Sequence, residues 1–216
     1  MKSFFTVLFL LLNCIQYNQA RDSIDIRMNN VPILKQPKSQ DCWATVITML
    51  FLWKVDSIKN NKEYNKKETN KLISQTIEAY GEDWHNLFKK NKGLSTDQKE
   101  KLFRQIGFES EPPANYIIEF YIDKLKSEGP LWITTSTAPN GLNSHAKLLI
   151  GIQGDMTYEN TFFAFIDPMY GKIINQRAID FVKEFENEAI YIVQELIGDK
   201  KMTWEQVDFR IQIIHW

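Results

Sequence analysis

The spacing of hydrophobic residues predicts helices in the first half of the chain and strands in the second. One buried helix face, with apolar residues at the i, i+3, i+4, i+7 spacing, is formed by Val46, Met49, Leu50 and Trp53. This pattern begins after Asp41, a residue type common at helix N-caps, so we predict that Cys42 is the first residue of the helix. The polar residues 54–71 predict a solvated loop or helix edge.

Further helical patterns follow before residue 130. They cover about residues 68–80, 82–90, 95–105 and 115–127. Ser95 and Gln98 carry the sequence signature of a capping box for the third of these helices. Four tryptophans in this part of the chain and just after it are expected in the core: Trp43, Trp53, Trp84 and Trp132.

Short apolar runs bounded by Gly, Asn and Asp predict strands after residue 130. These runs cover residues 131–135, 146–152, 162–166 and 172–174, with further candidates at 189–194 and 209–214. A helix is expected over residues 176–185, packed on the sheet. Because helices come first and an antiparallel sheet second, we predict a single α+β domain over residues 21–216.

Residues 1–20 have the pattern of a signal peptide. Lys2 provides a positive start, residues 4–12 are apolar except for Thr6, and polar residues then lead to Ala20. We therefore expect a secreted or periplasmic protein. A second interpretation is a lipoprotein signal, in which Cys14 would be acylated.

Composition and charge favour a globular protein without a nucleic-acid partner. Hydrophobic residues make up 44% of the chain and charged residues 25%, and the net charge is −1. Removal of residues 1–20 takes away Lys2 and no acidic residue, so the net charge becomes −2 (25 basic against 27 acidic). Such a balance gives no reason to expect nucleic-acid binding. No later segment has the length of a membrane span, and we expect a monomer.

Cysteine usage directs attention to Cys42. The only other cysteine, Cys14, lies in the predicted signal peptide, so the mature chain keeps one thiol and forms no internal disulfide. A thiol becomes a strong nucleophile when a helix N-terminus or a neighbouring imidazolium lowers its pKa. The predicted helix start provides the first of these conditions, and a histidine would have to provide the second.

His145 and Asp167 are the candidates to complete a catalytic triad. His145 precedes the predicted strand 146–152, and Asp167 follows the strand 162–166 directly before Pro168. Histidine and aspartate at the ends of neighbouring strands, facing a helix that begins with cysteine, match the geometry of thiol-based acyl transfer.

The reaction also needs a donor for the oxyanion, and Gln36 is the candidate. It lies six residues before Cys42 in a loop that can fold back, so its side-chain amide and the Cys42 N–H would form a two-donor oxyanion hole. Gln40 is the rival for this role. Of the remaining histidines, His85 is expected at the surface.

These residues resemble the motifs of papain-like cysteine peptidases. Residues 36–44 read Gln-Pro-Lys-Ser-Gln-Asp-Cys-Trp-Ala, and further motifs are Gly-Pro-Leu-Trp at 129–132, Ser-His-Ala at 144–146 and Ile-Asp-Pro at 166–168. They are similar to a bacterial branch, the effector proteases of plant pathogens and the bacteriocin-processing peptidases. The chain departs from papain itself in having Gln40-Asp41 before the cysteine, Asp instead of Asn as third member, and a shorter separation, 103 positions from Cys42 to His145.

The resemblance implies a papain-like fold, an N-terminal helical part packed on a C-terminal antiparallel sheet, and a peptidase acting on proteins or peptides. No metal or cofactor is implied, because one thiol without close-spaced partner ligands is a weak zinc signal. Two alternatives stay open. The same triad serves acyltransferases, deamidases and cell-wall amidases, and a papain-like domain can be a non-catalytic binding module.

Overall fold

A computed structural model describes residues 23–55, 64–112, 114–137, 144–200 and 212–216, and the side chains only up to residue 189 within the last helix. The predicted signal peptide, with Cys14, lies outside these residues. Among the described helices, none is both long and apolar enough to cross a membrane.

Helices form the first half of the domain, as the spacing of apolar residues predicted. They are α2 (Cys42–Lys54), α3 (Lys66–Ala79), α4 (Glu82–Lys89), α5 (Thr96–Ile106) and α6 (Ile118–Glu128). Ser95 caps α5, with Gln98 forming the predicted capping box. The strand β1 (Ile24–Arg27) precedes these helices, and the short β2 (Glu109–Ser110) lies between α5 and α6.

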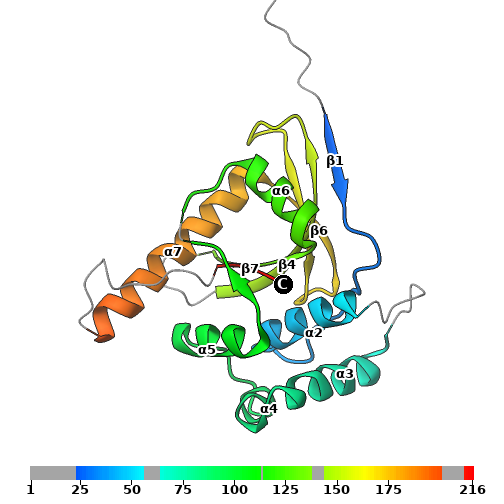
Figure 1. Ribbon diagram of the computed structural model, residues 1–216, viewed down its shortest axis with the longest axis vertical. Helices are drawn as coiled ribbons and strands as arrows, with labels where there is room; N and C mark the ends of the chain where they lie inside the picture. The colour runs from blue at the N-terminus through cyan, green and yellow to red at the C-terminus, as the bar shows by residue number, and fades with distance from the viewer. Residues whose placement is uncertain (1–22, 56–63, 113, 138–143, 201–211) are drawn as a thin grey trace, which may run out of the picture.

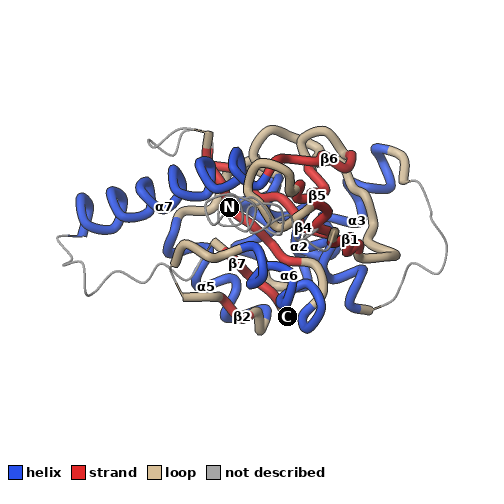
Figure 2. Tube along the Cα trace, turned by 90° about the horizontal axis from the view of Figure 1, so that it is seen from above, coloured by secondary structure: helices blue, strands red, loops and turns tan. Residues whose placement is uncertain are grey.

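Antiparallel strands form most of the second half. They are β3 (Leu131–Ser136), β4 (Ser144–Gly154), β5 (Phe162–Asp167), β6 (Lys172–Arg177) and β7 (Ile213–His215), with helix α7 (Ala178–Lys200) before β7. The sheet has the order β2-β7-β3-β4-β5-β6, and β1 pairs with the far end of β4. Strands run through the middle of the molecule with helices around them (Figure 2). The predicted α+β class is therefore confirmed.

Helices cover both faces of this sheet. In β3, Trp132 packs into a cluster with α2 to α5, whereas Leu131 and Ile133 pack into a second cluster with α6 and α7. This alternation follows from the two-residue period of a strand. Figure 1 shows α2 to α5 gathered below the sheet and α7 on its other side. Every residue of β3 is buried as a result.

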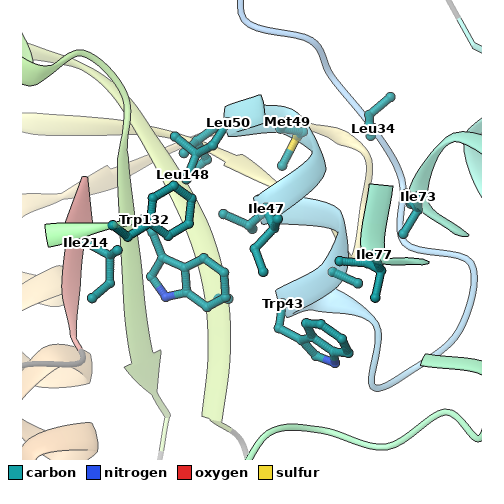
Figure 3. Packing of buried hydrophobic residues seen from close by; sticks show 14 of the residues in the cluster. Leu34, Trp43, Ile47, Met49, Leu50, Ile73, Ile77, Trp132, Leu148 and Ile214 are labelled. Atoms are coloured by element: carbon teal, nitrogen blue, oxygen red, sulfur yellow. The ribbon is translucent and has the colours of Figure 1, made fainter. Parts of the chain in front are cut away.

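Helix α2 is central to the first cluster, and its residues 43–50 are all buried. Figure 3 shows α2 between Trp132 and Leu148 of the sheet and Ile73 and Ile77 of α3. Trp43, Trp84 and Trp132 are buried as predicted, and Trp53 is partly buried. The burial of α2 holds its first residue, Cys42, in a defined position relative to the sheet.

Three predictions about single segments were wrong. The helix predicted at 176–185 begins only at Ala178, because β6 continues to Arg177, which pairs with Phe162. The candidate strand 189–194 lies within α7: no Gly or Pro interrupts residues 178–197, so the helix continues through β-branched residues. His85 is buried and hydrogen-bonded to Ser74, because α4 packs its apolar face on α3.

Candidate active site

Cys42 lies at the N-terminus of α2, at the wall of a cavity. It is the first residue of the helix, and its side chain is partly exposed. The first N–H groups of a helix have no partner inside the helix, so the Cys42 thiol and backbone N–H lie at the positive end of the helix dipole. The cavity that Cys42 lines has a volume of about 1190 Å³.

Two neighbouring strands bring His145 and Asp167 to this cavity. His145 is near the start of β4 and Asp167 ends β5, and the start of one strand lies beside the end of the other because the pair is antiparallel. His145 Nε2 lies 2.7 Å from Asp167 Oδ1. The His145 ring also interacts with the Cys42 thiol, and each group shifts the pKa of the other. All three side chains line the cavity.

Main-chain hydrogen bonds hold the carboxylate and the carbonyl of Asp167 in place. The N–H of Met169 donates to Asp167 Oδ1 at 2.8 Å, and the N–H of Gly171 donates to the Asp167 carbonyl at 2.8 Å. In addition, the N–H of Gln36 donates to the Pro168 carbonyl at 2.8 Å. The loop before the cysteine helix is thus tied to the turn after Asp167, which links the two halves of the site.

The electrostatics of the three side chains favour a thiolate beside an imidazolium. Burial raises the pKa of Cys42, but the hydrogen bond to His145 and the charge of that ring outweigh it and hold the pKa below its ordinary value. For His145, burial lowers the pKa, yet the hydrogen bonds to Asp167 and Cys42 raise it to about 9. Burial also acts against the Asp167 carboxylate, but the His145 interaction keeps its pKa lowered.

The family model of the papain-like cysteine protease AvrRpt2 matches residues 25–188, more than half of the chain. The chain belongs to the papain-like cysteine protease AvrRpt2 family. Members of the AvrRpt2 family are cysteine-type peptidases, so the protein is a hydrolase with a papain-like fold. A comparison with curated proteins found no match.

Within this AvrRpt2-type domain, Gln36 does not reach the cavity in the way its spacing suggested. Its amide nitrogen donates to the carbonyls of Lys38 at 2.8 Å and Ser39 at 3.0 Å, so both N–H groups serve the loop itself. Its Oε1 atom is buried without a hydrogen-bond partner among the described residues. Gln40, the rival candidate, lines the cavity next to Gly93.

Asp41, directly before Cys42, was predicted from the sequence only as the N-cap of the helix. Its side chain makes no cap hydrogen bond. The residue is 0% exposed, and within the described part of the chain neither carboxylate oxygen receives a well-formed hydrogen bond. Burial raises the pKa of Asp41, which Lys38 offsets only in part. The residue type at this position was compatible with a cap, and its burial depends on the fold around the loop.

The rest of the cavity wall comes from segments that the sequence did not connect to the triad. Helix α5 contributes Lys99, and α7 contributes Asp180 and Glu184. Three exposed apolar side chains also line it: Phe162, Met169 and Tyr170. The described residues contain no group of three His, Cys, Asp or Glu side chains that could hold a metal ion. Periodicity carries no signal for such contacts, because they join positions far apart in the chain.

Proposed function

We propose that this protein is a secreted, bacterial-type peptidase that hydrolyses peptide bonds with Cys42 as nucleophile, His145 as acid and base, and Asp167 as the residue that orients His145. The observation that carries this assignment is the hydrogen bond between His145 and Asp167, with Cys42 interacting with the same His145 ring from a helix N-terminus and all three side chains lining one cavity. Membership of the papain-like cysteine protease AvrRpt2 family supports the general class of reaction.

In the first half of the proposed reaction, the Cys42 thiolate attacks the carbonyl carbon of the peptide bond and a C–S bond forms. His145 donates its proton to the amide nitrogen, the C–N bond breaks, and the amine leaves. In the second half, His145 accepts a proton from water as the water attacks the thioester, and the C–S bond breaks to release the acid and the thiolate. Asp167 remains ionised and keeps the imidazole in one orientation.

We assign the oxyanion to the backbone N–H of Cys42 and the side-chain amide of Gln36. This role requires Gln36 to exchange one of its hydrogen bonds, to Lys38 or Ser39, for the oxyanion when substrate binds. Catalytic hydrogen bonds often reach their final geometry only with substrate bound. Turnover by Gln36→Ala and by Gln40→Ala tests the assignment: we expect a drop in kcat of about 100-fold for Gln36→Ala and little change for Gln40→Ala. The reverse order would give the role to Gln40.

Cavity size supports a protein or peptide substrate. Pockets for small molecules commonly enclose about 300–1000 Å³, and the cavity beside Cys42 has about 1190 Å³. A segment of polypeptide fills such a space better than a small amide does. Secretion rests on the pattern of residues 1–20 alone. Intact-mass measurement of the exported protein would test it, because removal of the signal peptide and acylation of Cys14 give different masses.

The direct test is labelling with an iodoacetamide or epoxysuccinyl probe together with cleavage of casein. An ordinary thiol, with a pKa of about 8.5, reacts slowly near neutral pH. We expect rapid labelling at Cys42 and casein cleavage, both lost in Cys42→Ala, and cleavage lost in His145→Ala. Asp167→Asn should slow casein cleavage, and Asp123→Asn, on the exposed face of α6 and outside the cavity, is its matched control. Slow labelling of the wild type with intact casein would refute the proposal.

A further inference from the structure

A buried lysine lies in the cavity wall that holds the nucleophile. Lys99 is 7% exposed and extends from α5 into the lining that also contains Cys42. Its Nζ atom lies 3.2 Å from Oε1 of Glu188, a residue of α7 that is 0% exposed. The second carboxylate oxygen of Glu188 accepts a hydrogen bond from the hydroxyl of Ser144. These three residues form the Lys99–Glu188–Ser144 cluster.

The cluster is attached to the catalytic strand. Ser144 directly precedes His145 and is the first residue of β4. Glu188 therefore connects α5 and α7 to the end of the strand on which His145 lies. Ser144 also pairs with Ser136 at the end of β3, so the cluster and the sheet hold the same strand end from two directions.

A buried ion pair at this position is difficult to explain by stability alone. Desolvation of two charges can exceed the attraction between them, and apolar residues of similar volume often replace such pairs without loss. In this pair the lysine lies on the cavity side, whereas Glu188 is not among the residues that line the cavity. The positive end of the pair is thus the end presented to the space around Cys42.

The orientation of the ion pair affects the Cys42 thiol, together with the other charged groups around it. Burial raises the pKa of Cys42, whereas His145 and then Lys99 lower it through their positive charge. His145 comes from β4, with Asp167 of β5 behind it, and Lys99 comes from α5. The loop before α2 adds Asp41, whose carboxyl is buried beside the helix start. Lys99 therefore lowers the pKa of the Cys42 thiol, as the His145 imidazolium does.

We propose that Lys99 is a positioning residue for the nucleophile: its buried ammonium group, anchored by Glu188, stabilises the Cys42 thiolate at the cavity wall. This inference rests on the proposed role of Cys42. The contact between Glu188 and Ser144 extends the same cluster to the strand that carries His145. The Lys99 ammonium group and the His145 imidazole are thereby held in fixed positions relative to the Cys42 thiol.

The test is the rate at which iodoacetamide alkylates Cys42, measured as a function of pH. We expect Lys99→Met to move the midpoint at which Cys42 becomes reactive upward by roughly half to one pH unit, as for the loss of a nearby unit charge. Lys99→Arg keeps the charge and should restore the wild-type midpoint. Arg104→Met is the matched control, because Arg104 lies on the same helix in an exposed ion pair with Glu100. A folded Lys99→Met protein with an unmoved midpoint would overturn the inference.

A second variant covers the case in which Lys99→Met does not fold. Lys99→Met/Glu188→Gln removes both buried charges and keeps side chains of similar shape, including an acceptor for the Ser144 hydroxyl. We expect a smaller upward movement of the midpoint, because the negative charge of Glu188 is removed together with the ammonium group, and no movement would again overturn the inference. A purely structural role would lower Tm and leave the midpoint in place. The proposed function fails by a different result, namely a wild-type Cys42 that reacts like an ordinary thiol.

Discussion

The interaction between His145 and Asp167 determines the pH at which the proposed catalytic pair is lost. Burial of His145 lowers its pKa, but the hydrogen bonds to Asp167 and Cys42 reverse this and raise the pKa from 6.5 to about 9. That difference corresponds to a preference of about 3 kcal/mol for the protonated ring. If Asp167 supplies about half of it, replacing its charge would lower the pKa of His145 by roughly one pH unit.

Asp167→Asn is the corresponding change, because asparagine keeps the size and removes the charge. We expect the upper limb of the pH profile of kcat/KM to move from about 9 down by roughly one pH unit. At the optimum, kcat/KM should fall by about 100-fold or more, since the imidazole loses the partner that fixes its orientation. Hydrolysis of a peptide substrate across the pH range measures both effects. An upper limb that stays at the wild-type pH would refute the stated role of Asp167.

The same interaction predicts how stability depends on pH. Because the pKa of His145 is raised in the folded state, its contribution is complete below pH 6.5 and is lost as the pH rises through about 9. Because the pKa of Asp167 is lowered, its contribution is present above pH 3.8 and is lost as the pH falls through the folded value. The difference in free energy of unfolding between wild type and Asp167→Asn should therefore be largest between these limits. Urea unfolding at several pH values measures it, with Asp123→Asn as control.

Two further substitutions test the surroundings of the N-terminus of α2 and the packing of Trp53 in the last turn of α2. Asp41→Asn should raise the free energy of unfolding at neutral pH by about 1 kcal/mol, because it removes a buried carboxylate without well-formed partners. Since burial raises the pKa of Asp41 above 3.8, the gain should shrink as the pH falls through this raised pKa and be absent below pH 3.8. A wild type that is more stable than the variant at neutral pH would contradict this. Gly129→Ala should lower the free energy of unfolding, measured with urea, by about 2–4 kcal/mol. The reason is that Gly129 has φ +89° and a methyl group there would lie 2.1 Å from the Trp53 ring. Gly107→Ala is its control: φ is +83° but no atom lies within 4 Å, so we expect about 1–2 kcal/mol, and equal losses in both variants would rule out the ring contact.

Local patterns were sufficient for most of the elements. The spacing of apolar residues predicted α2 from its first residue, Cys42, because a helix buries positions three and four apart. The capping box at Ser95 marked the start of α5, and short apolar runs bounded by turn residues marked β3 to β5. His145 and Asp167 were placed near strand ends for the same reason. Their meeting at 2.7 Å then follows from the antiparallel pairing of β4 and β5.

Only the tertiary structure decided the features that depend on contacts between distant segments. Residues 176–177 became strand because β5 offered a pairing partner, and the start of α7 packs Phe181 and Phe185 on the sheet. The direction of the Gln36 amide depends on the carbonyls of a tight loop. Lys99 and Glu188 are 89 residues apart, and their buried pair exists only because α5 and α7 meet beside the cavity. The sequence alone determined which residues carry the candidate chemistry, because periodicity and motifs are local. The charges and hydrogen bonds around the thiol were decided by packing, since they come from residues that only the fold brings together.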